Sequence, residues 1–375
     1  MPNVARSSDI VVIGAGIVGC AVAAELSRRG AVVSVLDARE PGAGATQASG
    51  GMLAPYTEAV EGGPFVELGA RSLAMFDDFV GTLEAETGID VGYERSGTLH
   101  IARAEESVAG FAATHRELAS MGVRSATLSP AEARTYEPNL TPAIYGGLLI
   151  PDQGLVSAPQ MMQALAIAAR QNGATFLEPA LAHRISSCVD GIDIDTGHGR
   201  IHAGAVVLAA GAWSGQIEVS GLTVPVPVKP VRGQLLHLGW GASQVARITW
   251  DERCYLVPWR DGTLLVGATV EDAGFDERTT VAGVHRLLEA VCDLLPDAET
   301  ATVLSVRVGL RPSSPDPLPL IGWSEVLPGL MYATGHYRNG VLLAPLTAQL
   351  VADAMLGGDR DPALGLTTPA RFGKL

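Results

Sequence analysis

Short apolar runs alternate with longer helical stretches at both ends of the chain. Residues 9–13 begin with Asp9 and continue as a β-branched apolar run, which is typical of a buried parallel strand. A helical stretch over residues 20–29 follows, and a second strand is expected over residues 31–36. The pattern returns late in the chain, with a strand over residues 330–334 and a helix over residues 341–356. These alternations predict an α/β fold with a parallel sheet.

A glycine motif lies between the first predicted strand and its helix. It reads Gly14-Ala15-Gly16-Ile17-Val18-Gly19, and Asp37 follows 18 residues after its last glycine. In a dinucleotide-binding turn, Gly14 would permit the tight turn, Gly16 would admit a pyrophosphate, and Gly19 would let the helix pack on the strand. The Asp37 carboxylate would accept hydrogen bonds from ribose hydroxyls and would disfavour a 2′-phosphate, as in NADP. A plain glycine-rich turn is the alternative.

Two segments of small residues are expected near the nucleotide. Residues 42–55 are small and polar for more than ten positions, so their main chain could lie against a cofactor, which favours FAD. A flexible linker is the alternative for this segment. The turn at residues 210–212 follows a predicted strand over residues 206–209 and is too small to obstruct a ligand, although ordinary packing would also explain it. No second glycine motif with its acid is present in the sequence, which disfavours a separate NAD(P)H domain.

The middle of the chain predicts a second, β-rich domain. Further helices are expected over residues 64–87, 104–121, 158–172 and 278–295, and a short one begins at Ser129-Pro130. The prolines within residues 224–231 suit an edge strand, because proline lacks the ladder donor. We expect a Rossmann-like FAD-binding domain of residues 1–85, 150–215 and 325–358, a substrate domain of residues 86–149 and 216–324, and a loose tail over residues 359–375.

Composition limits the partners of the chain. Its 375 residues are 47% hydrophobic and carry a formal net charge of −14, so it can bury a core and would repel the phosphates of nucleic acid. The four cysteines form no C-x-x-C pair, and His115, His183, His198, His202 and His285 are expected at the surface, so neither a disulfide framework nor a metal is expected. The longest apolar stretch is too short to span a bilayer, and we expect a soluble, cytoplasmic protein.

Several blocks resemble the D-amino-acid-oxidase-like family of FAD enzymes, and most of all its glycine oxidase (ThiO) branch. The likeness is carried by residues 11–19, 48–54, 251–269, 309–312 and 335–345 and extends over nearly the whole chain. It implies a two-domain fold of the p-hydroxybenzoate-hydroxylase kind with FAD. The implied reaction is the oxidative deamination of glycine, sarcosine and small D-amino acids, with hydride passing to flavin N5 and O₂ becoming H₂O₂. The implied pathway is synthesis of the thiamine thiazole.

The resemblance and the glycine motif together assign residues to the cofactor. Expected FAD contacts are Gly14, Gly16, Ile17, Val18, Gly19, Asp37, Ala38, Ala45, Thr46, Gly50, Gly51, Met52, Ala180, Ala210, Gly211, Trp213, His336, Tyr337, Arg338, Asn339, Gly340, Val341 and Leu342. The helix that begins near Val341 would direct its positive end at the flavin pyrimidine ring.

The same resemblance places the substrate on Arg311, Arg338 and Tyr255. A planar guanidinium can grip a carboxylate with two parallel hydrogen bonds, and a tyrosine hydroxyl can add a third. The alternatives are a surface ion pair for each arginine and a core position for the tyrosine. Met52 and Ala54 are expected beside the substrate as well.

Two departures from the family pattern affect the substrate pocket. Arg253 stands where this type of enzyme carries a histidine, and Val270 stands where it carries a methionine. The pocket shape is therefore left open, and the substrate could be a somewhat different amine or amino acid. No cysteine matches the one that attaches FAD in sarcosine oxidases, so the flavin is expected to be non-covalent. A dehydrogenase of D-amino or imino acids that uses another acceptor remains an alternative. So does a flavin-binding partner protein without turnover, and a homo-oligomer is expected from resemblance alone.

Overall fold

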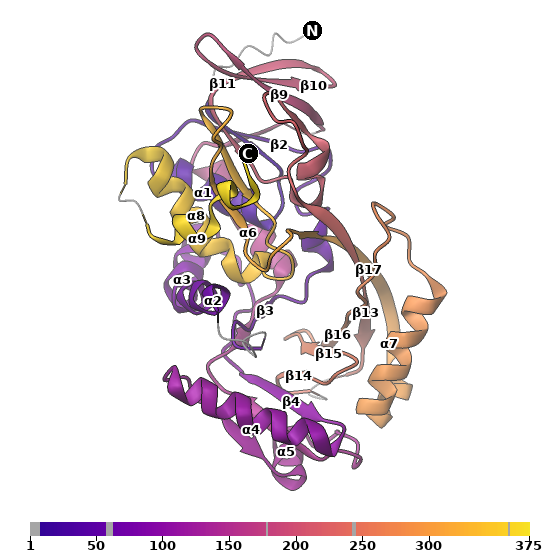
Figure 1. Cartoon of the computed structure of the whole chain (residues 1–375). Helices are drawn as coiled ribbons and strands as arrows, with labels where there is room; N and C mark the ends of the chain where they lie inside the picture. The colour runs from indigo at the N-terminus through magenta and orange to yellow at the C-terminus, as the bar shows by residue number, and fades with distance from the viewer. Residues whose placement is uncertain (1–7, 58–62, 178, 242–244, 359–360) are drawn as a thin grey trace.

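Two β-sheets connected by a long two-stranded ribbon form the framework of the molecule in the computed structural model (Figure 1). The structure describes residues 8–57, 63–177, 179–241, 245–358 and 361–375. The first sheet is made of β1 (Ser8–Ile13), β2 (Val33–Leu36), β8 (Thr175–Leu177), β9 (Ala182–Cys188), β10 (Gly191–Thr196), β11 (Gly199–Leu208), β12 (Glu218–Val219), β18 (Leu320–Trp323) and β19 (Leu330–Thr334).

The second sheet has the strand order β17-β13-β16-β15-β14-β4-β6-β5. Its strands are β4 (Thr98–Ala102), β5 (Ala126–Leu128), β6 (Gly146–Ile150), β13 (Lys229–Gly239), β14 (Ile248–Trp250), β15 (Tyr255–Pro258), β16 (Thr263–Gly267) and β17 (Thr302–Ser313). A small separate ladder joins β3 (Met52–Leu53) to β7 (Gly154–Leu155).

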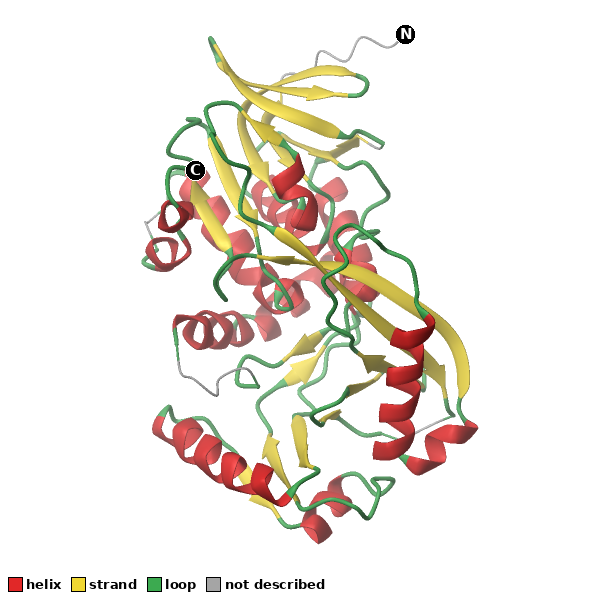
Figure 2. Ribbon diagram, turned by 45° about the vertical axis from the view of Figure 1, so that its right-hand side comes forward, coloured by secondary structure: helices red, strands yellow, loops and turns green. Residues whose placement is uncertain are grey.

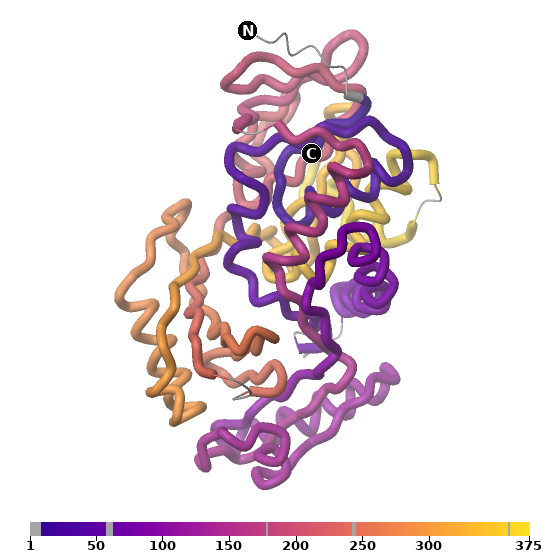
Figure 3. Tube along the Cα trace, turned by 180° about the vertical axis from the view of Figure 1, so that it is seen from behind, coloured from indigo at the N-terminus to yellow at the C-terminus, as the bar shows by residue number. Residues whose placement is uncertain are grey.

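Helices cover one face of the first sheet and the outside of the second (Figure 3). The α-helices are α1 (Ile17–Arg28), α2 (Pro64–Ala74), α3 (Phe76–Thr87), α4 (Glu105–Ser120), α5 (Pro130–Tyr136), α6 (Ala158–Gln171), α7 (Val281–Leu294), α8 (Gly340–Leu356) and α9 (Ala363–Thr367). Short 3₁₀ turns are η1 (Ala45–Ala48), η3 (Gly211–Gln216), η4 (Pro296–Thr300) and η5 (Pro369–Phe372).

The centre of the first sheet is parallel and is buried on both faces. β1 pairs in parallel with β2 and with β11, and β19 pairs in parallel with β11. Ile10 and Val12 of β1 pack with α1, α6 and α8, whereas Val11 and Ile13 pack into the core of the opposite face. A parallel strand buried on both faces needs apolar residues at every position, which explains the continuous run in the sequence. The predicted α/β fold is confirmed.

β13 and β17 form the ribbon that reaches from one sheet to the other (Figure 2). They pair along their whole length, from Lys229 opposite Ser313 to Gly239 opposite Thr302. One end of the ribbon contacts η1 and η3 beside the first sheet, and α7 packs on Leu236 of β13 toward the other end. The ribbon therefore brings residues from the second sheet to the edge of the first.

The structure corrects two of the expected elements. The helix expected over residues 64–87 is divided into α2 and α3 at Met75, where the backbone N–H bonds the carbonyl of Ser72 in a tightened turn. Residues 224–228 form no strand, because two prolines remove ladder donors there and Val226 and Val228 pack into the core instead. From Lys229 to Val231 the chain pairs with β17 alone, which is the expected edge position.

The C-terminal segment is packed, so the expectation of a loose tail is wrong. α9 and η5 lie within it, Arg371 pairs with Asp316 at 2.7 Å, and Leu375 is only 1% exposed. Residues 359–360 lie outside the described ranges. Strands β12 and β18, which fall in the ranges expected for the substrate domain, are hydrogen-bonded into the first sheet. In the described part of the chain, no helix has the length and apolar character needed to cross a membrane.

Candidate active site

A cavity of about 980 Å³ lies where the two sheets meet. Its walls include the segments that directly follow β1, β2, β11 and β19, so it opens at the carboxyl ends of the parallel strands. This edge is where ligands bind in open parallel sheets. Every residue predicted for the cofactor or the substrate lines this cavity, except Gly19 and Leu342. Gly19 lies against the β1 turn, and Leu342 is buried with its carbonyl bonded to the Ser72 hydroxyl at 2.6 Å.

Glycine occupies the three motif positions for different physical reasons. Gly14 has φ +111°, and a Cβ there would lie 2.4 Å from the Ala209 carbonyl oxygen. A Cβ on Gly19 would lie 1.9 Å from the Gly14 carbonyl oxygen, so both positions require glycine for packing. A Cβ on Gly16 would only meet the Thr46 hydroxyl at 3.6 Å, so Gly16 keeps space open within the cavity. This geometry fits the tight turn expected at Gly14 and the close helix packing expected at Gly19.

The amino end of α1 is suited to a negatively charged group. Its N-cap, Gly16, offers no side chain, and no acid lies in the first turn. The Ile17 N–H bonds the Thr46 hydroxyl at 3.1 Å, which ties η1 to the helix end. Exposed N–H groups and the helix dipole favour a phosphate at such a place. Cavity, glycine turn and helix end therefore fit the pyrophosphate of a dinucleotide such as FAD.

Asp37 lies at the nucleotide end of the cavity and is fixed by the backbone. One carboxylate oxygen accepts the Ala15 N–H at 2.6 Å, and the other accepts the Arg39 N–H at 2.9 Å. Each oxygen keeps a second lone pair, which can accept a hydroxyl. The Asp37 carbonyl also accepts the Ala180 N–H at 2.7 Å, which explains why Ala180 reaches the cavity.

The small-residue segment 42–55 is packed between the two sheets and is not a linker. The Gly42 N–H bonds the Ala15 carbonyl at 2.8 Å, and η1 contacts β17. A Cβ on Gly309 of β17 would lie 2.8 Å from the Ala48 methyl, so small side chains are needed on both elements. The composition that suggested cofactor contact thus also reflects close packing against the ribbon.

Three residues at the nucleotide end were not found by sequence reasoning. The Arg39 guanidinium lies 4.3 Å from the centre of the Trp213 ring and pairs with Glu277 at 3.0 Å. Phe275 contacts Trp213 from the other sheet, with ring centres 5.9 Å apart. Arg39 directly follows the Asp37-Ala38 pair, but no spacing connects it to residues more than 230 positions away.

Arg311 and Tyr255 meet at the other end of the cavity. The Arg311 guanidinium lies over Gly233, where a Cβ would come within 2.4 Å of it, and the Tyr255 ring lies over Gly267 in the same way, at 2.2 Å. Arg311 Nη1 donates to the carbonyl oxygen of Thr269 at 3.0 Å. Gly233 and Gly267 give these side chains the room to lie flat, and nothing in the sequence distinguished them from other glycines.

The charge of Arg311 is not neutralised by a carboxylate among the described residues. Burial lowers the pKa of its guanidinium, and the nearby charge of Arg338 acts in the same direction. Burial likewise raises the pKa of Tyr255 above its usual range, so this side chain is a hydroxyl donor at neutral pH. A half-buried cation beside a hydroxyl donor is a site for an anion.

The loop that follows β19 joins the two ends of the cavity. The Tyr337 N–H bonds the Pro312 carbonyl at 2.8 Å, which holds this loop beside Arg311. Arg338 is exposed and lies 5.1 Å from the Tyr337 ring centre. His336 is buried and contacts the Thr347 hydroxyl at 3.0 Å, and burial lowers its pKa to about 3, so the imidazole is neutral. Asn339 is the residue before α8, whose first turn carries no acid and borders the cavity.

The two departures from the family pattern lie at the rim of the cavity. The Arg253 side chain pairs with Glu289 at 3.0 Å and with Asp293, both on α7, so two acids neutralise its charge. Val270 is 54% exposed and leaves the rim open beside the Arg311 site. Met52 and Ala54 line the cavity as expected.

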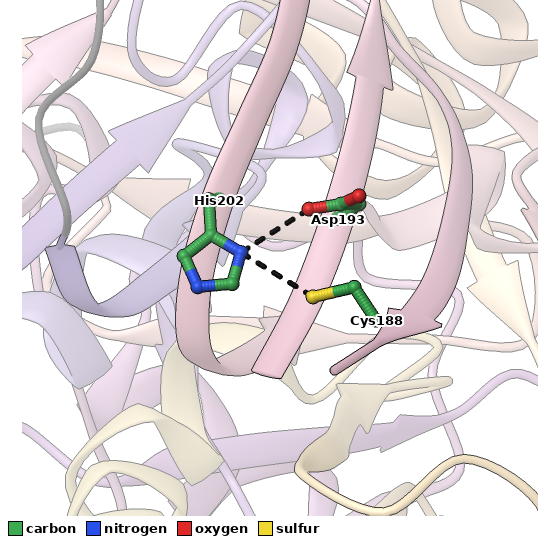
Figure 4. A group of neighbouring side chains, drawn as sticks. All are labelled: Cys188, Asp193 and His202. Carbon is green, nitrogen blue, oxygen red and sulfur yellow. Dashed lines mark hydrogen bonds and ion pairs between the residues drawn. The ribbon is translucent and has the colours of Figure 1, made fainter. Parts of the chain in front are cut away.

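A second polar cluster lies far from the cavity, on the β9–β10–β11 hairpins (Figure 4). His202 Nδ1 is 3.4 Å from Cys188 Sγ and 3.2 Å from Asp193 Oδ1, and His202 is exposed, as expected for it. The other Asp193 oxygen pairs with Arg200 at 3.5 Å. Both carboxylate oxygens are engaged and a guanidinium neutralises the acid, so these side chains form a hydrogen-bonded surface network.

Comparison with known proteins agrees with the geometry. Glycine oxidase from Geobacillus kaustophilus is 35% identical over 92% of each chain, and its crystal structure superposes with a TM-score of 0.94 over 98% of this chain and 99% of that one. The bifunctional protein ThiO/ThiG of Nostoc is 34% identical over 95% of this chain, which spans about half (54%) of that protein. Iminodiacetate oxidase from Chelativorans superposes with a TM-score of 0.87 at 26% identity, over 96% of this chain and 98% of that one.

The family description "FAD dependent oxidoreductase" matches residues 9–354, from the first residues of β1 nearly to the end of α8. The match therefore includes the glycine turn, the ribbon and the loop after β19. The chain belongs to the FAD dependent oxidoreductase family.

Proposed function

We propose that this protein oxidises glycine and other small amino acids, with FAD as its cofactor and O₂ as the electron acceptor. The substrate would yield an imine and then, with water, a 2-oxo acid and ammonia, while O₂ becomes H₂O₂. The 35% identity to a glycine oxidase over nearly the whole chain supports this activity. The likeness to the ThiO/ThiG proteins supports a place in thiamine synthesis.

One observation carries the proposal most strongly, namely the un-neutralised Arg311 beside Tyr255 at the end of the cavity. A small amino acid offers a carboxylate as its main handle, and a planar guanidinium can hold it with two parallel hydrogen bonds. The Tyr255 hydroxyl would donate to the same carboxylate. Arg338, from the loop after β19, would close over the substrate from the open side.

The cofactor and the protein divide the chemistry between them. When bound, FAD is the oxidant that would take a hydride from the substrate Cα and pass the electrons to the acceptor. The chain would orient the Cα–H bond by fixing the carboxylate, and orientation of this kind accounts for much of an enzyme's rate. The amino end of α8 would place its positive dipole beside the cofactor ring. No side-chain base is needed if the amine enters neutral.

We propose further that residues 1–85, 150–215 and 325–358 hold the cofactor and that residues 86–149 and 216–324 carry the substrate side. We also propose that the flavin is bound without a covalent link. Denaturing the purified protein would then release all yellow colour into the supernatant. Retention of flavin on the unfolded chain would contradict the second of these proposals.

The test of function is anaerobic mixing of the yellow protein with glycine, sarcosine, D-alanine, D-proline and L-proline. Bleaching of the flavin band by glycine or sarcosine, followed by rapid return in air with H₂O₂, is the expected result. Bleaching that air reverses only slowly would favour a dehydrogenase with another acceptor. Absence of bleaching by all five would contradict the proposed substrate class and favour a flavin-binding partner protein.

A further inference from the structure

A polar network lies beside the Arg311 site and centres on the partly buried Glu271, whose partners Arg232, Gln234 and Thr269 are buried. One carboxylate oxygen of Glu271 accepts from the Thr269 hydroxyl at 2.5 Å and from Gln234 Nε2 at 2.7 Å. The other accepts from the Arg232 guanidinium, at 2.6 Å from Nη2 and 3.2 Å from Nε. Burial tends to raise the pKa of Glu271, but the hydrogen bonds from Thr269, Arg232 and Gln234 outweigh it and hold the pKa below its usual range.

The backbone is locked to the same network. Arg232 and Glu271 exchange two backbone hydrogen bonds, at 2.9 and 3.0 Å, in an isolated bridge. The Gln234 N–H donates to the Thr269 hydroxyl at 2.9 Å, and the Thr269 N–H donates to the Gln234 carbonyl at 3.2 Å. Glu271 thus fixes the main chain on both sides of the gap between β13 and the segment after β16.

This main chain is what holds the Arg311 side chain. Arg311 Nη1 donates to the Thr269 carbonyl at 3.0 Å and approaches the Arg232 carbonyl at 3.4 Å. Both carbonyls belong to residues whose side chains bond Glu271. One edge of the guanidinium is therefore anchored by the network, which leaves its remaining N–H groups to face the cavity.

We propose that Glu271 is the positioning residue of the Arg311 site: it orients the guanidinium for a substrate carboxylate without touching the substrate. The inference rests on the proposed function, because it concerns the same anion site. A ligand-binding side chain whose neighbours hold it in one orientation loses less freedom on binding, and small misplacements are costly.

The test uses acetate, a carboxylate that cannot be oxidised, and reads its binding from the spectrum of the bound flavin. The Glu271→Gln variant keeps the shape of the side chain but loses its negative charge. Its amide N–H groups would also face the groups that donate hydrogen bonds to Glu271. We expect its Kd for acetate to rise by about 10- to 100-fold, with little change in the affinity for FAD. If the proposed function holds, the KM for glycine rises by the same factor while kcat changes less. Unchanged acetate binding would overturn the proposal.

A matched control separates positioning from general loss of stability. Glu137, the C-cap residue of α5, is a more deeply buried acid, bonded to the N–H groups of Ala246 and Arg247, and it has no bond to the residues that hold Arg311. Glu137→Gln is expected to change the melting temperature without changing the Kd for acetate. An equal loss of acetate binding in this variant would show that Glu271 has no special role.

A double-variant cycle tests whether Glu271 acts through Arg311. If it does, Glu271→Gln adds no further loss of acetate binding once Arg311 is already alanine. Additive losses would overturn the proposal, because the two residues would then act independently. If glycine fails to bleach the wild-type flavin but the acetate results hold, the proposed substrate is wrong and the positioning role stands.

Discussion

The two ends of the cavity recognise a ligand by different means. At the nucleotide end the contacts come from the backbone, where Gly14 and Gly16 shape a turn and α1 presents its amino end. At the other end they come from side chains, with Arg311 and Tyr255 lying flat over glycines. A backbone site depends on local sequence, whereas a side-chain site depends on segments that only the fold brings together. A mutation at one end should therefore weaken ligand binding at that end and leave binding at the other end unchanged.

The largest difference between the effect on substrate binding and the effect on FAD binding is expected for Arg311→Ala. Removal of one partner of a buried charge pair costs about 2–5 kcal/mol, so the KM for glycine should rise by about 30-fold or more. The FAD spectrum and the affinity for FAD should remain as in the wild type, because Arg311 lies at the far end of the cavity. Steady-state kinetics and flavin titration check both statements. Normal glycine oxidation by this variant would remove Arg311 from the site.

A glycine pair tests the nucleotide end in the same way. Gly14→Ala forces a side chain into a left-handed backbone, at about 1–3 kcal/mol, and against the Ala209 carbonyl, so the apoprotein itself should melt earlier. Gly16→Ala should leave the apoprotein within about 0.5 kcal/mol of the wild type but weaken FAD binding. Thermal melts of apoprotein and flavin titration distinguish the two. Equal melting losses would mean that Gly16 is also a packing residue.

A smaller effect is expected from Tyr255→Phe. Loss of one hydrogen bond to the substrate carboxylate is worth about 0.5–1.5 kcal/mol, so the KM for glycine should rise by about 10-fold at most. FAD affinity should not change. Comparison of acetate binding in the two proteins measures the effect without the chemical step, and a larger loss of FAD than of acetate would contradict the assignment.

The pH dependence of the substrate end follows from the same residue. The raised pKa of Tyr255 keeps its hydroxyl protonated past the ordinary value of about 10, so acetate affinity should not fall through Tyr255 between about pH 7 and 10. Above that range the phenolate would repel a carboxylate, and Tyr255→Phe should remove this part of the decline. If the affinity for acetate fell near pH 8 in the wild type but not in Tyr255→Phe, the pKa of Tyr255 would be lowered instead of raised.

The smallest effect is expected from the surface network. Cys188→Ser and His202→Ala change partly exposed side chains on the outer hairpins, so the free energy of unfolding should change by about 0.5 kcal/mol or less. Neither FAD affinity nor the KM for glycine should move. A clear change in either would show that the outer hairpins are coupled to the cavity.

The same contrast explains what the sequence could and could not predict. The glycine turn and the acid of the nucleotide end lie within residues 9–37, where each has a fixed spacing and a local reason. Arg311 and Tyr255 came from resemblance, and Gly233 and Gly267 could not be found because their neighbours across the sheet are known only from the fold. Glu271 was missed for the same reason, since its partners Arg232 and Gln234 belong to β13 and meet it only where the segment after β16 lies against that strand.

The aromatic residues at the two ends give the protein an internal optical reporter for each. Trp213 lies under Arg39 at the nucleotide end, and Trp250 lies 5.3 Å from Tyr255 at the substrate end. Tryptophan emission overlaps flavin absorption, so bound FAD will quench indole fluorescence by energy transfer. The chain has five tryptophans, so the difference in quenching between the wild type and Trp213→Phe, or between the wild type and Trp250→Phe, would report the indole at one end. Cofactor loading and substrate-end occupancy could then be followed separately from these two difference signals.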